Sequence, residues 1–143
     1  MFEILEEKKV ILLYIPLAVY WSALLIGTSL PADSLPGFGI GDKLLHFGAY
    51  LILAILLGLS LLFQNKNQLL KKKYILFSII ISSVYGMLDE IHQIFIPGRS
   101  NEFLDWTADF IGVLVGVLLV SITLNKMGYF VGSSARQREK LFK

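Results

Sequence analysis

Residues 88–109, LDEIHQIFIPGRSNEFLDWTAD, place a short polar stretch between two apolar runs and decide how the chain folds. The stretch carries five carboxylate residues together with His92 and Arg99, although hydrophobic segments flank it on both sides. A proline followed by a glycine is a strong turn signal, and here it separates the two runs. The spacing predicts two antiparallel helices joined by a tight turn over 97–102.

The composition of the whole chain indicates that these runs lie in a membrane. Of its 143 residues, 55% are hydrophobic and 17% are charged, with a mean hydropathy of +0.68. A soluble domain has roughly 25% charged residues, so a membrane protein is the better match. The chain has no cysteine, which excludes disulfides and thiolate metal sites. We expect no nucleic-acid partner.

Four segments are long and apolar enough to cross a bilayer as helices, namely 10–30, 44–63, 74–96 and 103–124. Crossing about 30 Å of hydrocarbon takes about 20 helical residues. Unpaired backbone groups are not tolerated in lipid, so helices are the form expected. We therefore predict an all-α, polytopic membrane protein in which residues 1–143 form one domain, a bundle of four transmembrane helices.

The distribution of basic residues predicts the orientation of this bundle. Eleven of the thirteen Lys and Arg residues precede the first segment, lie between the second and third, or follow the fourth. The connections 31–43 and 97–102 contain only two basic residues, Lys43 and Arg99. The positive-inside rule then predicts that both termini are cytoplasmic and that the polar turn lies outside the cell membrane. The basic tail 125–143 is expected to lie along the anionic inner leaflet.

The polar side chains of the third and fourth segments are expected to face each other. At 100° per residue, the polar side chains of the third segment occupy one half of its circumference and the apolar ones the other half. Glu90 and Asp109 each lie seven residues from their end of the turn, or about 10 Å along their helices, so they share a layer. Gly112 and Gly116 form a GxxxG pair that we interpret as a packing surface.

The second segment adds a third polar face, because Asp42 and His46 lie on one side of it at i, i+4 spacing. A charge at the bilayer midplane costs about 2.5–3.5 kcal/mol on insertion scales, so these groups need partners. One interpretation is a set of ion pairs that only fasten the bundle. The other is a pocket, whose candidate ligand-binding residues are Asp42, Lys43, His46, Glu90, Gln93, Arg99, Asp105 and Asp109.

Three pieces of the chain together resemble the VanZ-like family of small membrane proteins: DKLLHFGAY (42–50), YGMLDEIHQIFIPGRSNEFLDW (85–106) and ADFIGVLVG (108–116). The resemblance marks all the candidate residues except Asp109 as the family's shared polar set. At position 109 the family usually has Asn, so this chain carries an added negative charge. The founding member is associated with resistance to the glycopeptide teicoplanin. The resemblance thus implies a role at the cell envelope that changes susceptibility to such antibiotics.

The preferred hypothesis is an outward-opening polar pocket that binds an anionic or lipid-linked ligand. Arg99 and Lys43 are expected to hold a phosphate or carboxylate group, since Arg forms bidentate pairs with either. Membrane lipids are the expected partners, together with a lipid-linked cell-wall precursor or the glycopeptide itself. This hypothesis needs no cofactor and no metal.

Two further hypotheses stay open. In the first, the chain is an enzyme that catalyses hydrolysis or transfer on a lipid headgroup, with His46 as a general base beside Asp42 and with acidic residues and Arg99 in support. In a metal-dependent version, His46, Glu90 and Asp109 ligate a divalent ion, although no HExxH-like spacing supports it. The other hypothesis is a structural or accessory subunit of a membrane assembly.

Overall fold

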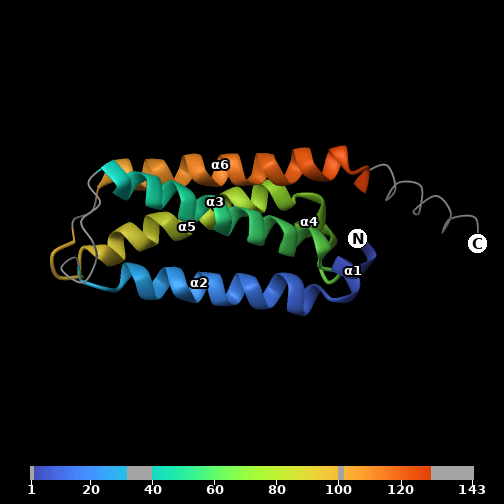
Figure 1. Ribbon diagram of the computed structural model, residues 1–143, viewed down its shortest axis with the longest axis horizontal. Helices are drawn as coiled ribbons and strands as arrows, with labels where there is room; N and C mark the ends of the chain where they lie inside the picture. Colours follow the sequence, from blue (N-terminus) through green and yellow to red (C-terminus); the bar gives the residue numbers. More distant parts are fainter. Residues whose placement is uncertain (1, 32–39, 100–101, 130–143) are drawn as a thin grey trace, which may run out of the picture.

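The computed structural model describes residues 2–31, 40–99 and 102–129, and within these ranges it contains helices and no strand. Four helical spans are long and apolar enough to cross a membrane: Val10–Thr28, Gly41–Phe63, Tyr74–Gln93 and Phe103–Lys126. They run along a common long axis, as Figure 1 shows. The predicted all-α bundle of four spanning helices is confirmed. Cytoplasmic termini and a single domain over 1–143 stay predictions.

The first span is divided, in contrast to the single helix expected over 10–30. A short α1 (Phe2–Glu7) precedes the π-helical turn η1 (Val10–Tyr14), and α2 (Ile15–Thr28) follows. Pro16 explains the division, because it lies in the first turn of α2. Proline has no N–H and its ring clashes with the carbonyl four residues earlier, so a regular α-helix cannot continue through it. A π turn before it absorbs the mismatch.

The other spans differ from the expected boundaries at their polar ends. Helix α3 (Ile40–Phe63) begins four residues before the expected 44, and α5 (Tyr74–Gln93) ends three residues before the expected 96. Helix α6 (Phe103–Lys126) begins where expected and extends two residues further. Between α3 and α5 lies a short α4 (Gln68–Lys72), which the sequence did not predict.

The connection from α5 to α6 contains the predicted tight turn. The backbone N–H of Arg99 donates to the carbonyl of Ile96 at 3.1 Å, with Pro97 and Gly98 between them. Gly98 has a φ of +75°, which only glycine adopts without strain. Proline followed by a residue of positive φ is the pattern of a type II turn. Residues 100–101 of the turn, 32–39 of the connection between α2 and α3, and 130–143 of the basic tail lie outside the described residues.

The most extensive helix contact joins α3 and α6, which begin at the same end of the bundle and run parallel (Figure 1). Gly112 and Gly116 make this contact possible, as the GxxxG spacing predicted. A Cβ atom on Gly116 would lie 2.5 Å from the carbonyl oxygen of Leu51, and one on Gly112 would collide with the carbonyl oxygen of Phe47. Both glycines therefore let the backbones of α3 and α6 touch.

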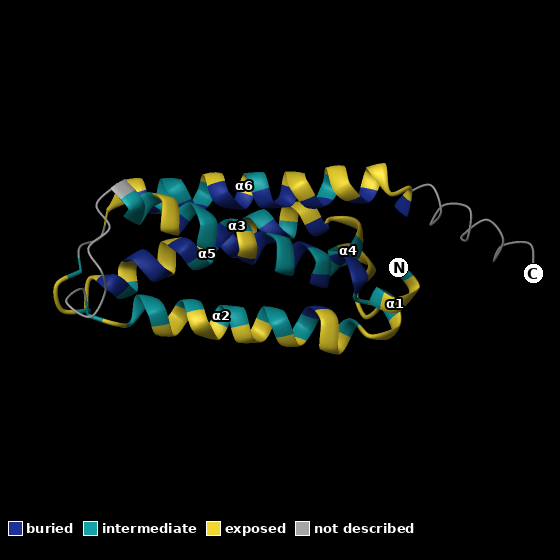
Figure 2. Cartoon of the chain, viewed as in Figure 1, coloured by how far each residue is buried: buried dark blue, intermediate teal, exposed yellow. Residues whose placement is uncertain are grey.

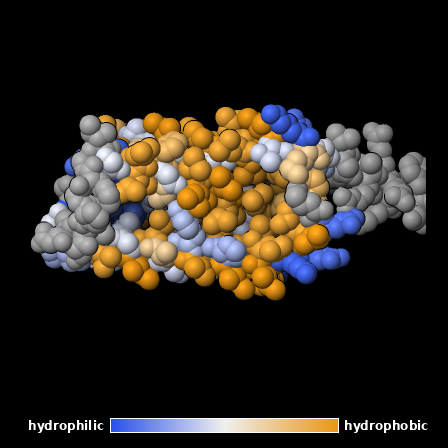
Figure 3. Space-filling model, viewed as in Figure 1, coloured by the Kyte–Doolittle hydropathy of each residue, from blue (hydrophilic) through white to orange (hydrophobic). Residues whose placement is uncertain are grey.

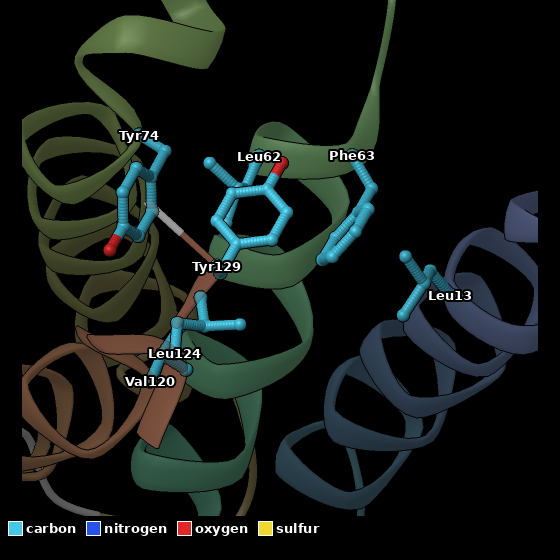
Figure 4. Packing of buried hydrophobic residues seen from close by; sticks show 7 residues of the cluster. All are labelled: Leu13, Leu62, Phe63, Tyr74, Val120, Leu124 and Tyr129. Carbon is cyan, nitrogen blue, oxygen red and sulfur yellow. The ribbon is translucent and has the colours of Figure 1, made fainter. Parts of the chain in front are cut away.

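Two groups of buried apolar side chains hold the bundle together. One lies near the end of α6 and is drawn in Figure 4; it comprises Leu13, Leu62, Phe63, Tyr74, Val120, Leu124 and Tyr129. The other lies nearer the middle, on α3 and α6, and comprises Tyr50, Leu53, Ala54, Val113 and Val117. Helix α2 contributes no buried residue to either (Figure 2). The core therefore consists of α3, α5 and α6, with α2 along its edge.

The outer surface of the bundle is apolar, as a lipid-facing surface should be. Large apolar side chains such as Val19, Ile26, Leu44 and Leu118 are all more than half exposed. On the face seen in Figure 3, apolar residues form a broad band, and the most strongly hydrophilic residues lie toward its ends. In water this arrangement would be unfavourable, whereas in a bilayer the exposed apolar area remains in contact with acyl chains.

The close α3–α6 contact predicts a position-specific effect of alanine. Gly112→Ala should lower the stability by about 1–3 kcal/mol, because the added methyl group forces the two backbones apart. Gly48→Ala is the matched control, since nothing lies within 4 Å of a Cβ atom there. The control should be neutral or slightly more stable, because alanine is the better helix former. Thermal unfolding in detergent measures both, and equal midpoints for the two variants would contradict the packing role.

Candidate functional site

Polar side chains gather where α5 ends and where α3 and α6 begin. We call this group the polar cluster, and its members are Lys43, His46, Asp89, Glu90, Gln93, Asp105 and Asp109. All except Lys43 are largely buried, with exposed fractions of 9% for His46 and 1–4% for the others. The cluster therefore lies inside the helix bundle rather than on its lipid-facing surface.

The amphipathic pattern of α5 explains why its acids face inward. Asp89 and Glu90 are buried, whereas Leu88 and Ile91 on the opposite half are exposed, as the predicted polar and apolar halves require. Gly86 leaves room beside them. A Cβ atom on it would lie 3.3 Å from Oδ2 of Asp109 and 3.2 Å from the ring of Tyr50, which is shorter than an ordinary van der Waals contact.

The centre of the cluster is His46 of α3, which lies between acids from α5 and α6. Its Nδ1 is 3.0 Å from Oδ1 of Asp109 and 3.9 Å from Oε1 of Glu90. One ligand atom from each of the three residues lies within 4.8 Å of the other two. The expectation that Glu90 and Asp109 share a layer is confirmed, with the imidazole as a third member of that layer.

A second set of interactions lies nearer the rim. The Nζ of Lys43 is 2.7 Å from Oδ1 of Asp105 and 2.9 Å from Oε2 of Glu102. Asp105 is buried, whereas the side chains of Lys43 and Glu102 are 41% and 49% exposed. Asp42 also approaches here, because one of its carboxylate oxygens lies within 4.8 Å of ligand atoms of His46 and Asp105. Lys43 therefore neutralises the rim of the cluster.

Two carboxylate oxygens at the centre have no hydrogen-bond partner in the described part of the chain, namely Oε1 of Glu90 and Oδ2 of Asp109. The other oxygen of Glu90 accepts the backbone N–H of Glu102 at 3.2 Å. A buried polar atom that lacks a partner costs about 1–3 kcal/mol, and more when it is charged. The centre of the cluster therefore has unused acceptor atoms and is suited to receive a donor or a cation.

Arg99 does not join the cluster but contacts the end of α2. Its guanidinium donates to the carbonyl oxygens of Gly27 at 3.1 Å and Leu30 at 3.3 Å. The last carbonyls of a helix have no partner within the helix, and a basic side chain often satisfies them. His92 makes a similar link, because its Nε2 is 3.0 Å from the hydroxyl of Ser29. Both residues fasten α2 to the α5–α6 hairpin.

The structure thus gathers seven of the eight predicted site residues at one end of the bundle. The eighth, Arg99, lies beside them and binds backbone carbonyls at the end of α2. The structure also adds two residues that the candidate set omitted. Asp89 is as buried as Glu90, and its Oδ2 accepts the hydroxyl of Tyr50 at 3.4 Å. The i, i+4 spacing of Asp89 with Gln93, and of His46 with Tyr50, was the signal available in the sequence.

This arrangement permits a limited set of chemical roles. Imidazole and carboxylate groups in contact can accept and donate protons, which is the basis of general acid–base catalysis. The same groups are also ligands for divalent cations. The apolar bundle around them excludes water, which strengthens electrostatic interactions with anything bound there. The centre is richer in acceptors than in donors, so it favours cations and hydroxyl or amine donors.

The fold and the cluster define a multi-pass membrane protein with a buried acidic site at one end of its core helices. The model of the family described as VanZ/LLP1 matches residues 5–124. The chain therefore belongs to the VanZ/LLP1 family, as the resemblance in the sequence indicated. No curated protein and no solved structure matches the chain.

The contact between Lys43 and Asp105 predicts a non-additive stability effect. Lys43→Gln should lower the thermal midpoint in detergent, because buried Asp105 loses the cation 2.7 Å away. The double variant Lys43→Gln/Asp105→Asn should regain part of the loss, since the unpaired charge is then removed. Strictly additive midpoint changes would contradict the coupling between the two side chains.

Proposed function

We propose that this protein works in the membrane of the cell envelope, where its polar cluster binds the headgroup of an anionic, lipid-linked ligand. By holding that ligand it alters susceptibility to teicoplanin-type glycopeptide antibiotics. Membership of the VanZ/LLP1 family over residues 5–124 supports a membrane role. The observation that carries the proposal is the pair of buried carboxylate oxygens without partners, on Glu90 and Asp109 beside His46.

A cluster that only fastened the helices would be expected to satisfy its own polar atoms. Replacing a buried ion pair by apolar side chains of similar volume is often neutral or stabilising, so stability alone is weak grounds for such a group. The rim satisfies its own charges, because Lys43 forms ion pairs with both Asp105 and Glu102. The centre, at His46, Glu90 and Asp109, leaves two carboxylate oxygens without hydrogen-bond partners in the described part of the chain. We therefore assign ligand binding to the centre.

Charge determines how the ligand is held. Four buried acids, Asp89, Glu90, Asp105 and Asp109, face only His46 and Lys43 as basic groups of the cluster. An anionic headgroup cannot enter such a site without a compensating cation or donors of its own. In the described arrangement Lys43 pairs with carboxylates and Arg99 with backbone carbonyls, so neither points a free guanidinium or ammonium group at the centre.

A second candidate function is hydrolysis or group transfer on a lipid headgroup. It is favoured by the 3.0 Å contact between Nδ1 of His46 and Oδ1 of Asp109, because a carboxylate that orients an imidazole is a common feature of general-base sites. A turnover assay on polyprenyl phosphates separates the two functions. Product formation that requires His46 makes the protein an enzyme, whereas retention of unchanged lipid makes it a binder.

The proposed function predicts that isosteric changes at the centre remove the phenotype. Expression of the wild-type gene should raise the teicoplanin concentration that inhibits growth. Glu90→Gln should return it to the empty-vector value, because the amide supplies a donor where the site needs an acceptor. Glu7→Gln is the matched control, since it is the same chemical change on α1. Growth inhibition and membrane levels of each variant are measured together.

Two outcomes decide against this function. Full protection by Glu90→Gln at wild-type membrane levels would leave the centre without a role and favour a structural or accessory subunit. Equal loss in Glu90→Gln and Glu7→Gln would show that the effect does not come from the site.

The orientation of the polar cluster toward the outside is tested by reporter fusions. A reporter active only in the cytoplasm should work at residue 143 and within the 64–73 loop, because nine of the thirteen Lys and Arg residues lie in this loop or in residues 126–143. A reporter active only outside should stay silent at both. An external signal at residue 143 would place the polar cluster on the cytoplasmic side and exclude a ligand on the outer leaflet.

A further inference from the structure

We infer that His46, Glu90 and Asp109 form a binding site for a divalent metal ion. The three residues come from α3, α5 and α6, and one ligand atom of each lies within 4.8 Å of the other two. All three are buried, with exposed fractions of 9%, 3% and 1%. This inference deepens the proposed function and rests on it for its biological meaning, although metal binding itself is measured without lipid or antibiotic.

The distances fit a bound ion after small side-chain movements. Zinc binds imidazole nitrogen and carboxylate oxygen at roughly 2.0–2.2 Å, which puts tetrahedral ligand atoms about 3.4 Å apart. Nδ1 of His46 is 3.0 Å from Oδ1 of Asp109 and 3.9 Å from Oε1 of Glu90, on either side of that value. Both separations lie within about 0.5 Å of the tetrahedral value, and the ligand atoms of Glu90 and Asp109 lie within 4.8 Å of each other.

The unsatisfied oxygens of Glu90 and Asp109 are independent support for a cation. Oε1 of Glu90 is the oxygen nearer to His46, and it accepts no hydrogen bond in the described part of the chain. The backbone N–H of Glu102 holds the other oxygen of Glu90, so the free one stays aimed at the imidazole. Such second-shell hydrogen bonds orient ligands at metal sites. A metal ion supplies the missing partner.

Charge and ligand type indicate the class of ion. Two carboxylates and a neutral imidazole balance a divalent cation, whereas Asp105 is already paired with Lys43. One nitrogen and two oxygen ligands suit Zn²⁺ or Mn²⁺. Three protein ligands leave a coordination position open, as in catalytic zinc sites. A phosphate oxygen of the proposed ligand fits that position, which explains how an acidic site holds an anionic headgroup. The preferred sequence-based hypothesis needed no metal.

A neighbouring group, Asp42, His46 and Asp105, also brings its ligand atoms within 4.8 Å of one another but is less suitable. Oδ1 of Asp105 accepts a hydrogen bond from Nζ of Lys43 at 2.7 Å, so a metal would have to displace an ammonium group. Asp42 lies nearer to solvent, at the beginning of α3. Glu90 and Asp109 each have a buried carboxylate oxygen without a hydrogen-bond partner in the described part of the chain, whereas Asp42 and Asp105 have none.

The test is direct titration of the full-length protein with metal. Protein purified in detergent without a histidine tag is stripped with EDTA, dialysed, and titrated with Zn²⁺ or Mn²⁺ alone. We expect one equivalent bound per chain and a higher thermal midpoint with metal, because an ion that binds only the folded state stabilises it. Glu90→Gln and Asp109→Asn should each weaken binding at least tenfold, since loss of even a second-shell partner costs 10–100-fold.

Glu7→Gln is the matched control, because it makes the same change as Glu90→Gln at an exposed position of α1, outside the polar cluster. It should bind metal within a few-fold of the wild-type protein. The inference is overturned if wild-type protein binds no metal at micromolar concentrations. It is also overturned if Glu90→Gln and Asp109→Asn bind as tightly as Glu7→Gln, because the ion then lies elsewhere.

X-ray absorption at the zinc edge of the loaded wild-type protein covers the case in which variants fail to fold. One imidazole with oxygen ligands supports the site, and two imidazoles overturn it, because His92 lies against Ser29 and not in the cluster. The two proposals fail separately. If the wild-type protein binds no metal but Glu90→Gln still loses the antibiotic phenotype, the metal site is wrong and the proposed function stands. If the protein binds metal but confers no antibiotic phenotype, the metal site stands and the proposed function is wrong.

Discussion

The contact between the backbones of α3 and α6 is the constraint on which the rest of the structure depends. Gly112 and Gly116 allow α6 to lie against α3 at Phe47 and Leu51. Because the two helices run parallel, this contact also fixes what meets nearer their beginnings. The next pair along is His46 with Asp109, and beyond it Lys43 pairs with Asp105. The polar cluster is therefore a consequence of the register that two glycines set.

The direction of the helices helps to stabilise this concentration of acids. Helices α3 and α6 both begin at the polar end, and Asp42 and Asp105 lie in their first turns. A helix N-terminus carries a partial positive charge, which stabilises carboxylates by about 0.3–1 kcal/mol each. Helix α2 ends there with the opposite partial charge, and the guanidinium of Arg99 binds its last carbonyls. Asp89 and Glu90 lie in the last turns of α5, where the helix dipole opposes their charge, so these two acids depend more on partners from the other helices.

The sequence predicted what depends on periodicity, and it missed what depends on contacts between distant segments. The four spans, the inward face of α5 and the shared layer of Glu90 and Asp109 follow from spacing along single helices, and all are present. The metal-dependent hypothesis grouped His46 with these acids, but the direct contact of His46 with Asp109 depends on the α3–α6 register, which no local pattern encodes. Arg99 was expected to meet an anion, but helix C-terminal carbonyls compete for the same donors. Pro16 lies within the predicted first span, but hydropathy alone does not predict the π turn before it.

A metal ion at the centre would unite the structural and functional explanations of the cluster. His46, Glu90 and Asp109 come from the three helices that form the core, so a single ion bound to them cross-links α3, α5 and α6. The binding free energy of such an ion contributes to folding free energy, because the unfolded chain offers no preformed site. It would offset the cost of the unsatisfied oxygens and leave a coordination position for a ligand. The same three residues would then both hold the bundle together and bind its ligand.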